Sequence, residues 1–366
     1  MKLFVNRLDK TAVPMLITAV LYFLFLFFSF NQFDPGTFPQ AADYFADATL
    51  VPSNLLVLPD STGYDGQFYY RIALNPLTRE KVEFGIGIDS PRYRHQRIIY
   101  PLLGWLFSFG EPLLVVYSLI FANFFMLLLI GHFAGSYAQL AKRHAIWGLA
   151  LSLYPGFIYT LSRDLVEITE AGILLAGLLF LEMKKESLAS TFFSLAILAK
   201  ETALLAAVAL LSQKKYWPVA LAPIAIYGLW QLMVNWWWRY GFDSSTRVNI
   251  GLPIVGIIEG YQIGYEPDRW SIAFGFLIIF LLFVLIGLQR SSAVRHVKIA
   301  WALYAFLLVC LTKNVWVESL AFLRAACLFY LTGTLILLKS RSPISILSFL
   351  LSIGFWIWLA SNWLNR

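Results

Sequence analysis

The chain has 366 residues, of which 59% are hydrophobic and 13% are charged, and its mean hydropathy is +0.70. Soluble proteins contain about 45–50% apolar and about 25% charged residues, so this composition excludes a soluble globular enzyme, a disordered protein and a disulfide-rich secreted domain. The net charge of +7 is typical of the basic cytoplasmic loops of a membrane protein and does not require a nucleic acid partner.

The apolar residues form long runs, as membrane-crossing helices of about 20 residues require, and do not alternate as in a β-barrel. The first run follows the basic segment Met1–Arg7 without a nearby cleavage site, so we expect an uncleaved first helix. We predict an all-α polytopic membrane protein with one integral membrane domain over residues 1–366. The runs lie at about 12–30, 112–140, 145–161, 168–183, 188–199, 202–212, 217–238, 271–288, 299–312, 322–338 and 343–360.

Short basic clusters separate these runs and indicate the orientation of the chain. They are Lys142-Arg143, Lys184-Lys185, Lys214-Lys215, Arg290 with Arg295 and Lys298, and Lys339 with Arg341. Short cytoplasmic loops carry an excess of Lys and Arg, so these clusters and the N-terminus are predicted to face the cytoplasm. The alternation then gives about eleven spans with the C-terminus outside. Only Asp9, Glu182 and Glu186 among the acids fall on the cytoplasmic side, which places the polar machinery outside.

The segment 188–212 allows two interpretations. Leu188–Ala199 and Thr202–Ser212 are each short for a span, and Lys200-Glu201 separates them. One long helix would bury this charged pair and invert every later loop. Two short arms that meet at an outward-facing Lys200-Glu201 keep the basic clusters on one side, so we favour the two arms.

The largest predicted non-spanning region is a first extracytoplasmic loop over residues 31–111. Within it, Ile98–Phe109 is apolar but too short to cross, so we expect a helix at the outer interface. A second extracytoplasmic loop is expected at 239–270, where the glycine-rich Gly251–Gly260 suggests a re-entrant or lid segment.

The first loop contains Tyr64-Asp65-Gly66-Gln67-Phe68, which puts a carboxylate beside a flexible glycine, an amide and aromatic rings. A carboxylate in this setting is suited to act as general base on a hydroxyl group. The aromatic rings suit a sugar, and Gln67 suits its hydroxyl groups. The alternative is an Asp-Gly turn with tyrosines at the membrane interface.

This loop resembles that of GT-C superfamily membrane glycosyltransferases, and most closely that of the PIG-V-type mannosyltransferases and their bacterial relatives. The family carries an aromatic-Asp-x-Gln-aromatic motif, then Arg-Ile-Ala and Tyr-Pro-Leu-Leu, matched here by Tyr64–Phe68, Arg71–Ala73 and Tyr100–Leu103. A basic turn, a helix with an internal proline and an outward acidic motif follow, matched in part by Tyr154–Phe157 and Ser162–Glu167. The resemblance covers roughly the first 200 residues. Tyr64 stands where relatives often have Trp, and Ser162-Arg163-Asp164 is closer to the protein-mannosyltransferase and aminoarabinose-transferase branch.

The resemblance implies a polyprenyl-phosphate-sugar donor that carries mannose or another hexose, and an acceptor hydroxyl on a glycan, lipid or protein. Asp65 would act as general base of an inverting transfer on the extracytoplasmic side, in the bilayer of a bacterial inner membrane. No cofactor and no metal is expected, because no second histidine gives His95 metal-ligand spacing. The candidate substrate-binding residues are Gln67, Tyr69, Arg71, Arg94, Arg97, Asp164, Glu167, Lys200 and Arg324.

Each candidate cation also has a structural interpretation. The loop arginines can pair with loop acids, Arg163 with Asp164 or Glu167, Lys200 with Glu201, and Arg324 with Glu318. A charge in mid-membrane costs about 2.5–3.5 kcal/mol on insertion scales, so Lys200 and Arg324 are expected to face a cavity or a partner. The alternative functions are a transporter or flippase of lipids or lipid-linked sugars, and a non-catalytic membrane subunit. A transporter often shows repeated halves, and no clear repeat is present.

Overall fold

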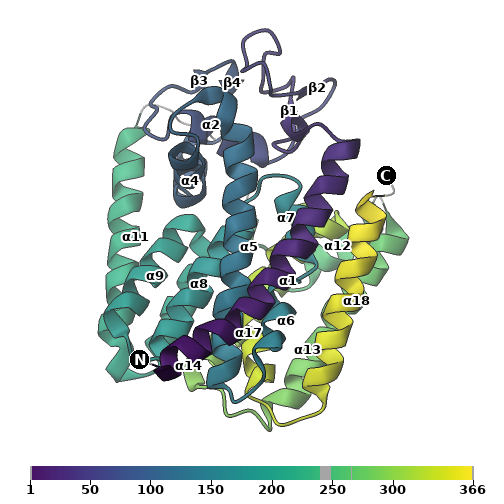
Figure 1. Cartoon of the computed structure of the whole chain (residues 1–366). Coiled ribbons are helices and arrows are strands. Elements are labelled where there is room, and N and C mark those ends of the chain that lie inside the picture. The colour runs from purple at the N-terminus through teal and green to yellow at the C-terminus, as the bar shows by residue number, and fades with distance from the viewer. Residues whose placement is uncertain (1, 240–248, 265, 365–366) are drawn as a thin grey trace.

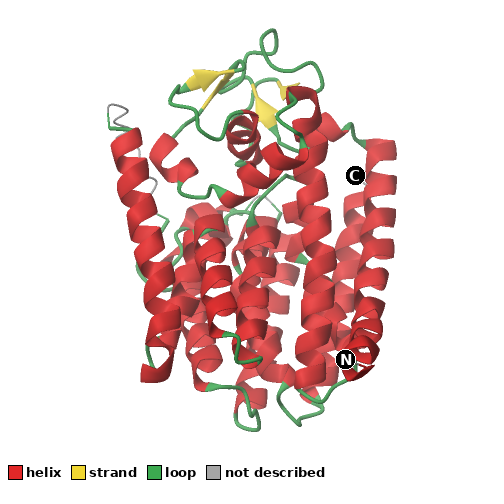
Figure 2. Cartoon of the chain, turned by 60° about the vertical axis from the view of Figure 1, so that its left-hand side comes forward, coloured by secondary structure: helices red, strands yellow, loops and turns green. Residues whose placement is uncertain are grey.

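Helices make up most of the structure, and a small region of loops and short strands covers one end of the helical body (Figures 1 and 2). The computed structural model describes residues 2–239, 249–264 and 266–364. In lipid every backbone polar group must be satisfied within the protein, which favours helices for apolar segments of this length. The all-α prediction is confirmed, and the strands among the described residues are four of two residues each.

Five helices in the described part of the chain are long and apolar enough to cross a membrane. A sixth span is formed if α16 (Ser319–Ala325) and α17 (Cys327–Leu338), which are bent by 54° at Ala326, count as one. Their outer faces carry exposed apolar side chains such as Phe23 and Leu350. This is the surface expected of a membrane-embedded protein. The five are α1 (Lys2–Gln32), α5 (Val115–Leu140), α11 (Trp217–Trp237), α13 (Pro267–Leu288) and α18 (Ile344–Leu364).

The remaining helices are shorter, and several complete the body between the long ones. In the body these are η3 (Ala145–Gly148), α6 (Leu149–Ser152), α7 (Gly156–Leu161), α8 (Glu167–Glu182), α9 (Glu186–Ala199), η4 (Glu201–Ala203), α10 (Leu204–Leu210), η5 (Lys214–Tyr216), α12 (Val255–Ile263), α14 (Arg295–Val309) and α15 (Lys313–Trp316). The predicted run 145–161 is interrupted before Pro155, whose ring cannot continue a helix. Each predicted apolar run contains helix, but eleven crossings would require these short helices to span as well.

The first predicted loop contains its own short elements at the top of Figure 1. These are η1 (Pro35–Thr37), β1 (Ala41–Ala42), β2 (Val57–Leu58), α2 (Gly66–Leu74), β3 (Val82–Glu83), β4 (Ile86–Gly87), α3 (Pro91–His95), α4 (Ile99–Phe107) and η2 (Pro112–Leu114). Strands β1 and β2 pair in parallel with Ala41 opposite Val57, and β3 and β4 pair antiparallel with Val82 opposite Gly87. The short helix predicted over Ile98–Phe109 is confirmed as α4, which packs against α2 and α5.

The turns with basic clusters gather at the end of the body opposite this loop. Arg143 donates to the carbonyl oxygen of Leu338 at 3.3 Å, and Lys339 pairs with Glu182 at 2.7 Å. At the same end, Ser291 forms an isolated bridge with Ser340. The basic turns therefore share one side of the protein, as the charge pattern predicts.

The helix break between the two predicted short arms is confirmed. Helix α9 ends at Ala199, Lys200 has extended backbone angles (φ −159°, ψ 136°), and a new helical segment starts at Glu201. Glu201 contacts Arg97 of the first loop, so the break lies on the loop side of the body. The second predicted loop, 239–270, lies partly outside the described residues; within it, α12 packs against α15, and Gly256 and Gly260 allow the close approach.

Candidate functional site

Asp65 lies immediately before α2, with its carboxylate between two guanidinium groups. Arg94 Nη1 of α3 is 2.8 Å from Oδ1, and Arg324 Nη2 of α16 is 3.3 Å from Oδ2. The Asp65 side chain keeps 27% of its surface exposed. The structure thus brings together a loop residue and two arginines, one of which comes from the second half of the chain.

The charge state of Asp65 follows from these neighbours. Burial opposes ionisation, but the positive charges of Arg94, Arg324 and Arg97 outweigh it and hold the pKa of the carboxyl below its usual range. Arg94 is in turn held by Asp89, which accepts from Nε at 2.8 Å and from Nη2 at 2.7 Å. Asp65 is therefore an ionised carboxylate at ordinary pH.

Glu167, at the start of α8, joins the two halves of the site. Its side chain is 1% exposed, and Oε1 accepts from Lys200 Nζ at 3.0 Å and from Arg324 Nη1 at 2.8 Å. Lys200 reaches it because the chain is extended at the break after α9. The interpretations that pair Lys200 with Glu201 and Arg324 with Glu318 are therefore wrong, since both cations share Glu167.

Glu201 instead pairs with Arg97. Arg97 Nε lies 2.8 Å from Glu201 Oε2, and Nη2 contacts the other carboxylate oxygen. Arg97 Nη1 also donates to the Tyr69 hydroxyl at 3.1 Å, and its guanidinium lies over the Tyr93 ring at 4.4 Å. The predicted site residues Arg97 and Tyr69 are thus adjacent to the arginines around Asp65.

The Arg163 side chain lies against two tyrosine rings near Asp65. Its guanidinium lies 4.5 Å from the centre of the Tyr64 ring and 4.2 Å from that of Tyr159. Glu318 accepts from the Tyr64 hydroxyl at 3.2 Å and from the Tyr159 hydroxyl, and it lies 3.7 Å from Arg163 Nη2. The pairing of Arg163 with Asp164 or Glu167 is therefore wrong. Its partner is Glu318, and cation–π contacts hold it over the tyrosines.

We call these neighbouring ion pairs, which tyrosine rings link to one another, the Asp65 cluster. It contains Asp65, Asp89, Arg94, Arg97, Arg163, Glu167, Lys200, Glu201, Glu318 and Arg324.

Two candidate residues of the motif lie in structural positions of the loop instead. Gln67 is buried and donates to the carbonyl oxygen of Thr62 at 2.9 Å. Arg71 is fully buried and pairs with Glu83 at 2.7 Å. The expectation that these two contact substrate is not supported by their positions. Burying an arginine requires a partner and hydrogen bonds, and this local pair supplies them.

Asp164 is also separate from the Asp65 cluster. It is fully buried, neither carboxylate oxygen has a hydrogen-bond partner in the described part of the chain, and burial raises its pKa well above the usual range. Its backbone is left-handed, with φ at 49°. Burial therefore favours the neutral form of this carboxyl, and its surroundings do not support a role in binding substrate.

The turn that contains Asp164 nevertheless positions Asp65. A Cβ on residue 66 would lie 2.2 Å from the carbonyl oxygen of Arg163 and 2.8 Å from that of Pro39. Only glycine therefore allows the start of α2 to pack on this turn. The glycine of the motif serves this close backbone approach and is not a flexible hinge.

Replacement of Gly66 by alanine is expected to destabilise the protein by about 1–3 kcal/mol, because backbone atoms must move to accept the methyl group. Thermal unfolding in detergent measures the effect. Gly228 in α11 is the matched control, since a Cβ there meets nothing within 4 Å. Equal unfolding temperatures for Gly66→Ala and Gly228→Ala would contradict the packing described here.

His95, next to Arg94, is expected to make stability depend on pH. It is buried, Nδ1 lies 3.1 Å from the carbonyl oxygen of Pro91, and burial lowers its pKa to about 4. In the unfolded chain the histidine has a pKa of about 6.5. As the pH falls, the unfolded state therefore takes up a proton before the folded state does, and this uptake favours unfolding. Stability should fall by roughly 1–2 kcal/mol between pH 7 and pH 5.

Unfolding temperatures at pH 7 and pH 5 test this expectation. His95→Gln should show the smaller pH effect, because glutamine takes up no proton. An equal pH effect in both proteins would show that His95 is not the responsible group.

The sequence does not predict the contacts of Asp89, Glu318 and Glu201: Asp89 is not among the candidates, Glu318 is expected to pair with Arg324, and Glu201 with Lys200. Asp89 lies five residues before Arg94, a spacing with no periodic meaning in a loop, so no sequence signal marks it. Glu318 follows Trp316 at the start of a short helix, and only the fold brings it to Tyr64.

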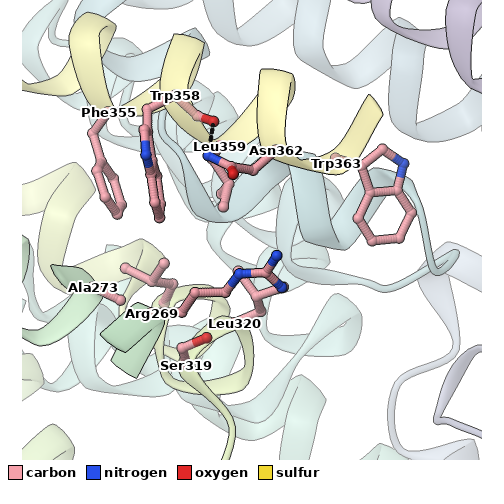
Figure 3. Close-up of a pocket in the computed structure, with 10 residues that line it drawn as sticks. Arg269, Ala273, Ser319, Leu320, Phe355, Trp358, Leu359, Asn362 and Trp363 are labelled. Carbon is pink, nitrogen blue, oxygen red and sulfur yellow. Dashed lines mark hydrogen bonds between the residues drawn. The ribbon is translucent and has the colours of Figure 1, made fainter. Parts of the chain in front are cut away.

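A narrow cleft lies between α13, α16 and α18 (Figure 3). Its open space is small, about 20 Å³, and its lining is mostly apolar, with Trp358 and Leu359 on one side and Arg269 on the other. Helix α16 contributes Leu320 and Leu323 to the cleft and Arg324 to the cluster. One short helix therefore connects an apolar cleft to the charged site.

Among the described residues, no three or more His, Cys, Asp or Glu side chains form a group that could hold a metal ion. The chemistry of the cluster is that of a carboxylate, several guanidinium groups and aromatic rings. Comparison of the chain with protein-family models, with curated proteins and with solved structures gave no match in any of the three.

Proposed function

We propose that the protein is a membrane glycosyltransferase of the GT-C type that moves a hexose, such as mannose, from a polyprenyl-phosphate donor to an acceptor hydroxyl. The observation that carries this proposal is Asp65, an ionised and partly exposed carboxylate between Arg94 and Arg324. A base for the hydroxyl and cations for a phosphate leaving group stand side by side. Such a transfer needs both.

The reaction follows from these groups. An Asp65 carboxylate oxygen accepts the proton of the acceptor hydroxyl while the hydroxyl oxygen bonds to the anomeric carbon. The bond from this carbon to the phosphate oxygen breaks, its electron pair stays on the phosphate, and the configuration inverts. Guanidinium groups can bind phosphate oxygens through two parallel hydrogen bonds, so Arg94 and Arg324 suit the leaving group.

The proposal also includes how the helices described above cross the membrane. We propose about eleven crossings, with the short helices spanning in part, and with the basic turns in the cytoplasm of a bacterial cell. The Asp65 cluster then faces outward from the inner membrane.

Purified protein incubated with a panel of radiolabelled polyprenyl-phosphate sugars tests this function. The expected result is release of polyprenyl phosphate and transfer of the label to a glycan, lipid or protein from the same membranes. Transport of the labelled donor across liposomes without any cleavage would contradict the proposal and indicate a flippase instead.

A further inference from the structure

Two arginines at Asp65 are each anchored on one side by another carboxylate. Asp89 accepts two hydrogen bonds from Arg94, through Nε and Nη2, which leaves Nη1 directed at Asp65. Arg324 Nη1 is held by the buried Glu167, which leaves Nη2 directed at Asp65. The two remaining donors thus converge on one anion from fixed positions.

Asp65 is bound less completely than the anchoring carboxylates. It receives one hydrogen bond from each arginine, and the bond from Arg324 is long at 3.3 Å. By contrast, Asp89 binds Arg94 through both carboxylate oxygens, and Glu201 binds Arg97 in the same way. Of the three carboxylates that bind Arg94 and Arg324, which are Asp65, Asp89 and Glu167, Asp65 is therefore the most weakly held.

The charges of the cluster are balanced in the free protein. Its five cations, Arg94, Arg97, Arg163, Lys200 and Arg324, are matched by five anions, Asp65, Asp89, Glu167, Glu201 and Glu318. An incoming anion must therefore compete with a carboxylate already present, since no unmatched charge within the cluster awaits it. The weakly held Asp65 is the carboxylate it would replace.

We propose that Arg94 and Arg324 form a clamp for a phosphate group, that Asp65 occupies this clamp in the free protein, and that the incoming phosphate displaces it. This inference rests on the proposed function, in which the phosphate belongs to the lipid-linked donor. A phosphate offers more acceptor oxygens to the two guanidinium groups than one carboxylate does. Once displaced, Asp65 loses its two stabilising cations and becomes a stronger base for the acceptor hydroxyl. Donor binding and activation of the base are thus the same event.

Binding of dodecyl phosphate and of inorganic phosphate to the purified protein in neutral detergent tests the clamp. Asp65→Asn removes the internal competitor and should bind dodecyl phosphate about tenfold more tightly, which corresponds to about 1.4 kcal/mol. Arg324→Gln should bind it more weakly than the native protein. Asp60→Asn is the matched control, because it makes the same change at an exposed residue of the same loop whose positive φ of 49° asparagine tolerates.

Unchanged or weaker binding by folded Asp65→Asn would overturn the clamp, and so would unchanged binding by Arg324→Gln. Gel-filtration elution and unfolding temperature establish that each variant is folded. If Asp65→Asn does not fold, Arg324→Gln alone decides between a binding and a purely structural role. Tighter binding of dodecyl than of inorganic phosphate supports a lipid phosphate, whereas equal binding would overturn the lipid part of the inference.

The binding result is separable from the proposed function. Loss of sugar transfer in Asp65→Asn without tighter phosphate binding would refute displacement and leave the transferase proposal standing. Tighter phosphate binding with sugar transfer retained in the same variant would support the clamp and refute Asp65 as the base.

Discussion

Replacing Asp65 by asparagine is expected to reduce sugar transfer by about 10²–10⁴-fold, the usual contribution of a positioned general base. Asparagine has nearly the same shape, but its single oxygen can accept a hydrogen bond on one side only, and it cannot take the proton of the acceptor hydroxyl. The loss should fall on kcat, because the clamp for the donor phosphate stays in place and is relieved of its competitor. Initial rates with saturating donor measure it.

Asp60→Asn provides the control for this measurement, since it removes one carboxylate charge from the same loop without touching the cluster. Its rate should match that of the native protein. Sugar transfer at the native rate by folded Asp65→Asn would show that Asp65 is not the general base.

Glu167→Ala is expected to have the largest effect on stability, a loss of about 3–5 kcal/mol. The substitution removes the shared partner of Lys200 and Arg324, so that Lys200 loses its ion pair and Arg324 keeps only the one with Asp65. Because Arg324 also contacts Asp65, the same change should weaken phosphate binding. Denaturant or thermal unfolding in detergent measures the loss of stability.

Glu186→Ala is the corresponding control, as Glu186 is an exposed acid in the first turn of α9. It should cost less than about 1 kcal/mol, the usual contribution of an acid at a helix start. A similar small loss for Glu167→Ala would show that Glu167 does not anchor the two cations.

The apolar runs predict the helical body well because lipid allows few alternatives to helices. The break at Lys200 follows from the same reasoning, since a charged pair inside a single span would be costly. Asp65 is also predictable, because an acid between aromatic residues in a polar loop stands out by local sequence. These features depend on residues that are close together in the chain.

The partners of the charged residues could not be predicted in this way. Lys200 and Arg324 each have an acid nearby in sequence, yet both pair with Glu167, because helix packing and not sequence spacing determines which side chains meet. The motif residues Gln67 and Arg71 are drawn into the loop interior by their own neighbours, which a one-dimensional pattern does not show.

The most direct test of the proposed site is a structure of the protein in a lipid nanodisc with a bound polyprenyl phosphate. We expect phosphate density within hydrogen-bond distance of Arg94 and Arg324, with the Asp65 carboxylate moved away from both. Phosphate density found only at the opposite end of the body, beside the turns of Arg143 and Lys339, would contradict the proposed site.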